Sequence, residues 1–128
     1  MNAERRTKTF AEIDLRQRTK KYALRIIRLF TSLDKSTVAQ VLGRQMLRSG
    51  TSVGAHHREA SRARSVAEFV SKMETGLQEL DETAYWLELL IESQLIPASR
   101  LAPLIDETEQ LVSIFVASVK TSKLKRHY

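Results

Sequence analysis

The stretch GRQMLRSGTSVGAHHREASRAR, residues 43–64, decides the fold because it joins a face of small residues to a stripe of arginines. The stripe spans roughly 80° of a helical projection and about 27 Å of helix, and its members are Arg44, Arg48, Arg58 and Arg62. The opposite side presents Ser49, Gly50, Val53 and Gly54. Each glycine in a helix costs roughly 1 kcal/mol relative to alanine, so we expect this small face to pack closely against another helix.

Length and composition predict one all-helical domain covering residues 1–128. A hydrophobic content of 42% suits a single globular core. Four glycines, two prolines and few aromatic residues favour helices over a β-sandwich or barrel. The chain contains no cysteine, which excludes disulfides, thiolate metal sites and cysteine nucleophiles.

The amino terminus, MNAERRTKTFAEIDLRQR, is charged and lacks the apolar core of a signal peptide. No apolar run approaches the roughly 18 residues that span a bilayer. We therefore expect a cytoplasmic protein.

Charge is segregated along the sequence. Residues 1–64 hold 15 Lys and Arg against five Asp and Glu, whereas residues 65–119 hold two against ten. The last nine residues add four basic side chains, and the whole chain carries a formal charge of +6. Such segregation favours a polyanionic partner, an acidic neighbouring subunit, or both.

Hydrophobic periodicity predicts four amphipathic helices, at residues 13–33, 37–60, 65–94 and 99–122. The third begins at a capping box, in which Ser65 precedes Glu68 by three residues. In the second, the predicted core positions are Val38, Val41, Leu42, Met46, Ser49 and Val53. Short connections favour an antiparallel up-down-up-down four-helix bundle, with residues 1–10 and 123–128 as flexible basic tails.

Two further charged stripes accompany the arginines of residues 44–62. One face of the first helix presents Arg18, Lys21, Arg25 and Arg28. No acid separates these cations, so a dedicated anion surface competes with the usual interpretation as solvated charge. One face of the third helix presents Glu74, Asp81, Glu88 and Glu92. An acidic face of one protomer meeting a basic face of the next would close a head-to-tail ring.

The segment from Arg44 to Ile96 resembles the signature of a family of small four-helix bundle proteins. That family was first described as reading frames in intervening sequences of large-subunit rRNA, and it includes the accessory variability determinants of diversity-generating retroelements. The matching positions are Gln45, Arg48, Ser52, Val53, Glu59, Glu68, Phe69, Glu79 and Leu80. His56 and Ala60 depart from the asparagine and glycine of the family pattern.

The resemblance implies a homopentameric barrel without enzymatic activity or cofactor. For the retroelement branch it implies a basic pentamer that binds nucleic acid and a reverse transcriptase. The pI of about 9.9 fits that branch better than less basic relatives.

The histidines do not form a recognisable metal or catalytic pattern. His56 and His57 are adjacent, so they point about 100° apart on a helix, and no Glu-x-x-His or His-Glu-x-x-His spacing occurs. We predict no metal site and no catalytic residue, and we expect His57 to add phosphate contacts at lower pH. The aromatic residues Phe69, Tyr85 and Trp86 do not interleave with the basic stripes, and we expect them in the core or an interface.

The sequence therefore favours a non-enzymatic accessory protein that binds RNA or DNA through Arg18, Lys21, Arg25, Arg28, Arg44, Arg48, Arg58 and Arg62. The acidic stripe of Glu74, Asp81, Glu88 and Glu92 is expected at an oligomer interface. Two alternatives remain open: a scaffold whose basic face receives an acidic protein, and stripes that serve only ring assembly.

Overall fold

The described part of the chain folds into four α-helices. The computed structural model describes the backbone of residues 3–125 and the side chains of residues 15–125. The helices are α1 (Ala3–Thr31), α2 (Thr37–Ser61), α3 (Val66–Glu92) and α4 (Ala98–Lys125). No strand occurs within residues 3–125. The all-helical, four-helix prediction is confirmed.

The terminal helices extend beyond their predicted ends. α1 begins at Ala3 instead of residue 13, and α4 continues to Lys125. Residues 3–10 and 123–125 are therefore helical, although the sequence predicted them as tails. Residues 1–2 and 126–128 of the predicted tails lie outside the described residues.

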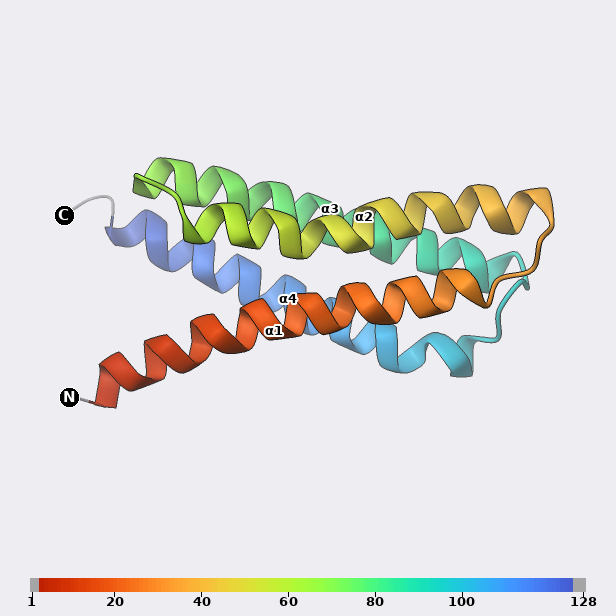
Figure 1. Ribbon diagram of the computed structural model, residues 1–128, viewed down its shortest axis with the longest axis horizontal. Helices are drawn as coiled ribbons and strands as arrows, with labels where there is room; N and C mark the ends of the chain where they lie inside the picture. Colours follow the sequence, from red (N-terminus) through yellow and green to blue (C-terminus); the bar gives the residue numbers. More distant parts are fainter. Residues whose placement is uncertain (1–2, 126–128) are drawn as a thin grey trace.

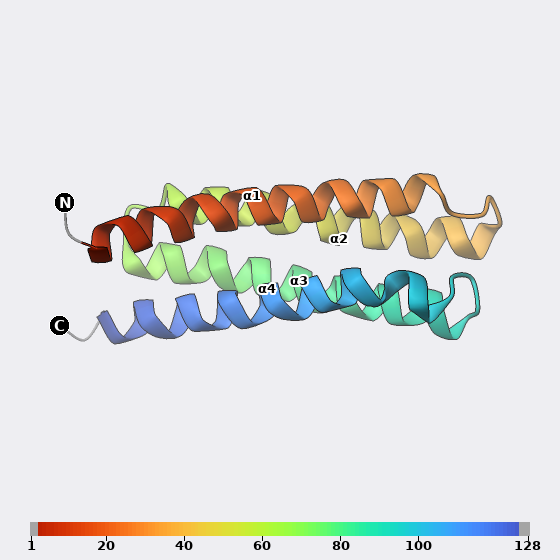
Figure 2. The same cartoon turned by 90° about the horizontal axis from the view of Figure 1, so that it is seen from below.

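The helices lie along one long axis, and both termini are at the same end of the molecule (Figure 1). The chain runs away from that end along α1, returns along α2, and repeats this course through α3 and α4. Figure 2 shows α1 and α2 on one side and α3 and α4 on the other. Helices that follow one another in sequence pack closely, whereas α1 and α4 cross with few contacts.

Serine caps begin the two central helices. Ser36 Oγ accepts a hydrogen bond from the Ala39 N–H at 3.3 Å, and Ser65 Oγ accepts one from Glu68 N–H at 3.1 Å. Glu68 in turn accepts from the Arg64 N–H at 3.3 Å. Each cap satisfies an N–H that has no partner within its helix, which fixes where α2 and α3 start.

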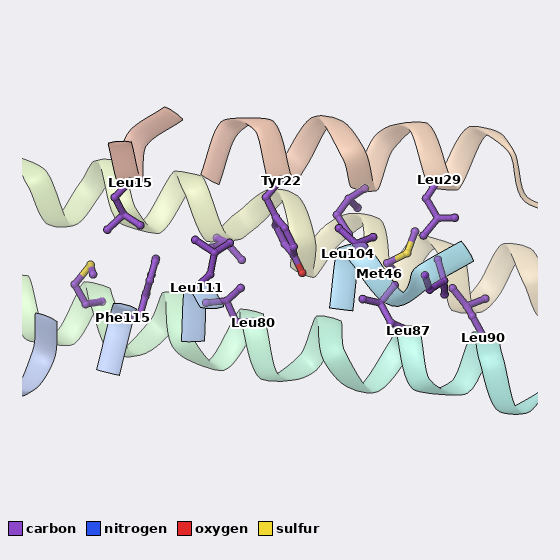
Figure 3. Close-up of a cluster of buried hydrophobic side chains, with 14 of the residues drawn as sticks. Leu15, Tyr22, Leu29, Met46, Leu80, Leu87, Leu90, Leu104, Leu111 and Phe115 are labelled. Atoms are coloured by element: carbon purple, nitrogen blue, oxygen red, sulfur yellow. The ribbon is translucent and has the colours of Figure 1, made fainter. Parts of the chain in front are cut away.

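The core is a column of aliphatic and aromatic side chains contributed by all four helices (Figure 3). Tyr22 of α1, Leu80 of α3, and Leu111 and Phe115 of α4 are completely buried. Phe69 and Trp86 pack against this column, as predicted, whereas Tyr85 is 53% exposed. Burial of this apolar surface is the main favourable contribution to folding.

The glycines of α2 bring α1 into close contact. A Cβ atom built on Gly50 would lie 2.8 Å from Ile26 Cγ1, and one on Gly54 would lie 3.2 Å from Thr19 Oγ1. Gly43 meets Phe30 and Leu33 in the same way. The prediction that the small face packs closely against another helix is confirmed, and that helix is α1.

Four buried hydroxyl groups, one from each helix, interrupt the apolar core. We call Tyr22, Ser49, Thr83 and Thr108 the hydroxyl layer; each is at most 1% exposed. Tyr22 Oη lies 2.7 Å from Thr108 Oγ1, and Ser49 Oγ lies 2.7 Å from Thr83 Oγ1. Burial raises the pKa of Tyr22 to about 12, while hydrogen bonding by Thr108 and Thr83 opposes that rise.

The buried face of α2 differs from the predicted one at its start. Val38 and Val41 are 56% and 51% exposed, so these two core predictions are wrong. Ala39 and Gly43 are buried in their place. The small residues allow the close approach to α1, and this approach turns the two valines outward.

Among the described residues, no helix combines the length and apolar character that crossing a membrane requires.

Candidate functional site

The basic stripe of α1 lies on the flank that faces α4. Arg18 forms a forked ion pair with Glu107 of α4, with Nη2 2.6 Å from Oε1 and Nε 3.2 Å from Oε2. The same guanidinium also donates to Gln110 at 3.0 Å. Two parallel hydrogen bonds between arginine and a carboxylate are among the stronger polar contacts in proteins. Arg18 therefore tethers α1 to α4 where the two helices have few other contacts.

Further along the same flank, three arginines surround a hollow of about 280 Å³ between α1 and α4. Arg25 and Arg28 come from α1 and Arg100 from the first turn of α4, and Leu29, Leu101 and Leu104 complete the lining. We call this site the three-arginine hollow. Arg100 Nη2 donates to Ser32 Oγ at 2.7 Å, which holds the start of α4 against the end of α1.

Sequence reasoning missed Arg100. The residue lies 72 positions beyond Arg28, on another helix, and no periodicity relates the two. One signal was present: Arg100 and Lys72 are the only basic residues between positions 65 and 119, where ten acids occur. An isolated cation in an acidic segment is a reason to ask what it faces.

The basic stripe of α2 divides into paired and unpaired members. Arg48 Nη2 lies 2.7 Å from Glu82 Oε2, and Nη1 lies 3.5 Å from Glu79 Oε2. The hydrogen bond to Glu82, followed by the charge of Glu79, raises the pKa of Arg48. Arg44, Arg58 and Arg62 are exposed and have no ion pair with any described side chain.

The two basic stripes therefore diverge. Arg18 reaches α4, whereas Arg48 reaches α3. Glu79, Glu82 and Glu107 all belong to the acidic half of the sequence, so opposite charges that are far apart in sequence meet in the fold. Segregation along the chain is only partly preserved in space.

The acidic stripe of α3 runs along the groove between α3 and α4. Glu74 and Asp81 line one stretch of about 410 Å³, where Glu74 lies 3.2 Å from Lys123 Nζ. Glu88 and Glu92 line a second stretch of about 290 Å³ together with Glu109 of α4. Hydrogen bonding and charge from Glu88 raise the pKa of Glu92. The three carboxylates of the second stretch have no ion pair with a described cation.

The adjacent histidines face different neighbours. His56 Nδ1 lies 3.5 Å from Glu59 Oε2, and its Nε2 lies 4.0 Å from Glu79 Oε1. His57 is 6% exposed, and its ring lies 6.4 Å from that of Phe115. Burial, and then the charges of Arg16 and Arg58, lower the pKa of His57. A buried imidazole that resists protonation does not contact phosphate, so the prediction of phosphate contacts by His57 is wrong.

Within the described residues, no cluster of three or more histidine, aspartate or glutamate side chains is arranged to hold a metal ion.

Comparisons with known proteins place this geometry in context. Residues 11–117 match the family described as 23S rRNA-intervening sequence protein. A crystal structure from Bacteroides thetaiotaomicron, of a protein with unknown function from the S23 ribosomal protein family, superposes with a TM-score of 0.80. Its sequence is 33% identical, and the match covers 85% of this chain and 97% of that one. No curated protein matches the chain.

Proposed function

Because the chain belongs to the 23S rRNA-intervening sequence protein family, we propose that it is a non-enzymatic, basic accessory protein that binds the phosphate backbone of nucleic acid. The observation that carries this proposal is a set of cations without acidic partners. Of the eight cations singled out in the sequence, six make no ion pair with a described side chain: Lys21, Arg25, Arg28, Arg44, Arg58 and Arg62. Arg18 and Arg48 are paired, and they contribute only if those pairs open.

Contacts of this kind bind by displacing counterions, so affinity depends steeply on salt. If the six unpaired cations each meet one phosphate, affinity falls about 10³-fold between 50 and 200 mM salt. Sequence preference is expected to be weak because these side chains meet phosphate groups. No aromatic residue lines the three-arginine hollow, so we do not expect nucleic-acid bases to stack there.

Fluorescence anisotropy with RNA, an RNA/DNA hybrid and DNA at both salt concentrations tests the proposal. We expect binding that weakens steeply with salt, and a further loss in the Arg44→Glu and Arg58→Glu variants. Arg48→Glu is a matched control on the same helix, because Arg48 already faces two carboxylates. Absence of binding to all three nucleic acids, or binding that ignores salt, contradicts the proposal.

We further propose that antiparallel up-down-up-down protomers assemble into a homopentameric barrel. The acidic groove lies on the α3 side of α4, whereas the three-arginine hollow lies on its α1 side. Opposite charges on two different flanks suit a head-to-tail contact between successive subunits. Glu74, Asp81, Glu88 and Glu92 would then face the basic flank of the next protomer. Light scattering that finds a monomer at micromolar concentration overturns this proposal.

The resemblance to retroelement accessory proteins extends the proposal to a reverse transcriptase as protein partner. The alternative is a scaffold of the rRNA intervening-sequence branch whose charged faces serve ring assembly or an acidic protein. Reversing the charge of Arg44 separates these functions if RNA binding survives while capture of the protein partner is lost. The neighbouring gene also discriminates between them: a reverse transcriptase indicates the first, and an rRNA gene indicates the second.

A further inference from the structure

The three-arginine hollow concentrates positive charge that no described carboxylate pairs with. None of its lining residues is acidic. Glu107, the carboxylate of α4 that faces this flank, is held in the forked pair with Arg18. Arg25, Arg28 and Arg100 thus share one small volume without a described counterion. Three like charges at close range repel one another, and a bound anion removes that cost.

The position of Arg100 adds a second, independent argument. It is the third residue of α4, and the first turn of this helix contains no acid. The N-terminus of a helix carries partial positive charge, so a cation there is unfavourable unless an anion is close by. Arg28 lies in the last turn of α1, where a cation is favourable, so the helix dipole explains Arg28 but leaves Arg100 unexplained.

The protein orients two of the three cations. Arg100 donates a hydrogen bond to Ser32 and Arg25 is half-buried, while the side chains of Arg28 and Arg100 are exposed and accessible to a ligand. The apolar floor consists of Leu29, Leu101 and Leu104, none more than 7% exposed. The hollow of about 280 Å³ is open to solvent, so a phosphate group of an extended chain can reach it.

We propose that the three-arginine hollow is a phosphate-binding site in which Arg25, Arg28 and Arg100 together hold one phosphodiester group of a nucleic-acid backbone. The inference rests on the proposed function and deepens it, because it assigns Arg100 to the interface and names one anchoring point. The planar guanidinium fork matches two phosphate oxygens, a geometry that lysine does not reproduce.

Anisotropy titrations of a short fluorescent RNA against single variants test the site. We expect Arg25→Ala and Arg100→Ala each to weaken binding about tenfold. Because the three arginines share one phosphate, the double variant should lower the salt slope by no more than about one. Arg100→Lys should keep the salt slope but still weaken binding, because the charge remains and the fork is lost.

Two control variants exclude trivial explanations. Arg64→Ala removes the same charge from the exposed connection between α2 and α3, and it should change affinity less than twofold. Ser32→Ala removes the hydrogen bond that joins α4 to the end of α1 and keeps the charge of the Arg100 guanidinium. If Arg100 acted only by joining α4 to α1, Ser32→Ala would weaken binding as much as Arg100→Ala, and the proposal would be wrong.

The outcomes separate this inference from the proposed function. RNA binding that Arg25→Ala and Arg100→Ala weaken no more than Arg64→Ala overturns the site while the function stands. A wild-type protein that binds no nucleic acid overturns both. An NMR titration with pyrophosphate then shows whether the hollow takes a free phosphate compound, a result that replaces the backbone assignment with a small-molecule one.

Discussion

Gly50 and Gly54 lie one turn apart on α2, yet they meet α1 differently. A Cβ atom at position 50 would lie within 3.1 Å of three carbon atoms of Ile26, so an added methyl group would collide with a branched side chain in the core. Gly54 faces Thr19 at 3.2 Å, where a shift of a few tenths of an ångström suffices. Alanine substitutions at the two positions therefore distinguish the effect of close packing on stability from the effect of intrinsic helix propensity.

Gly50→Ala should lower the free energy of unfolding by about 1–2 kcal/mol, because a collision costing about 1–3 kcal/mol exceeds the roughly 1 kcal/mol gained in helix propensity. Gly54→Ala should change it by less than about 0.5 kcal/mol, because the two effects nearly cancel. Chemical denaturation of both variants measures the difference. Equal effects would show that the contact with Ile26 is not tight.

His57 should make stability depend on pH. Burial, Arg16 and Arg58 lower its pKa in the folded state, so the unfolded state takes up a proton first as the pH falls. Its contribution to stability is complete above the ordinary pKa of 6.5 and is lost as the pH falls through the lowered value. The melting temperature of the wild type should therefore decrease between about pH 7 and about pH 5.5.

His57→Phe should flatten that dependence, since it removes the titrating group and keeps a ring beside Phe115. The neighbouring hollow of about 440 Å³ leaves room for the larger ring. His56→Gln is the control, because His56 is more exposed and lies beside carboxylates. Identical pH slopes for wild type and His57→Phe would assign the acid sensitivity to other groups.

At the scale of the element, the sequence pattern predicted those features of a helix that depend on residues close together in the chain. The Ser65 cap sets the start of α3, although Glu68 accepts from the Arg64 N–H instead of completing a capping box with the Ser65 N–H. The glycines of α2 indicate a close contact. Both signals act within a few residues. Hydrophobicity wrongly predicted that Val38 and Val41 are buried. The buried face of α2 is set by the smallest side chains rather than the most apolar ones, and only packing against α1 shows this.

The hydroxyl layer gives a prediction that couples α1 to α4. The Thr108 hydroxyl donates to the Leu104 carbonyl at 2.8 Å, so the hydrogen bond between Tyr22 and Thr108 is donated by Tyr22. Tyr22→Phe should lower the free energy of unfolding by about 1 kcal/mol. The double variant with Thr108→Val should cost less than the sum of the two single changes, as measured by a double-mutant cycle. Strict additivity would mean that the two hydroxyls act independently.

At the scale of the whole molecule, charge could be counted from the sequence but not located. The stripes of α1, α2 and α3 were predicted because each lies on one helix. The pairs Arg18 with Glu107 and Arg48 with Glu82 join residues 89 and 34 positions apart, and Arg100 joins the basic site across the bundle. These contacts depend on which helices lie next to each other in the bundle, and the periodicity of a single helix does not indicate its neighbours.

The assembly proposal predicts different consequences for the acids of one stripe. Glu88 and Glu92 have no described cationic partner, whereas Glu74 is already paired with Lys123. Reversing both Glu88 and Glu92 to lysine should convert the pentamer to a monomer in native mass spectrometry at micromolar concentration. Glu74→Lys should weaken the pentamer less than the double variant, because Glu74 is already paired with Lys123. A double variant that still assembles would remove this groove from the interface.

The hydroxyl layer has a consequence outside the core. Aliphatic layers in a bundle are nearly interchangeable, so a helix that slips by one turn, about 5.4 Å, can still bury its stripe. Directional hydrogen bonds from Tyr22 and Ser49 make one height of each helix preferable to the others. A slip of α4 by this amount would move Arg100 out of register with Arg25 and Arg28 of α1. The hydrogen bonds of the core would thus hold the surface arginines of different helices in the relative positions that binding a phosphate backbone requires.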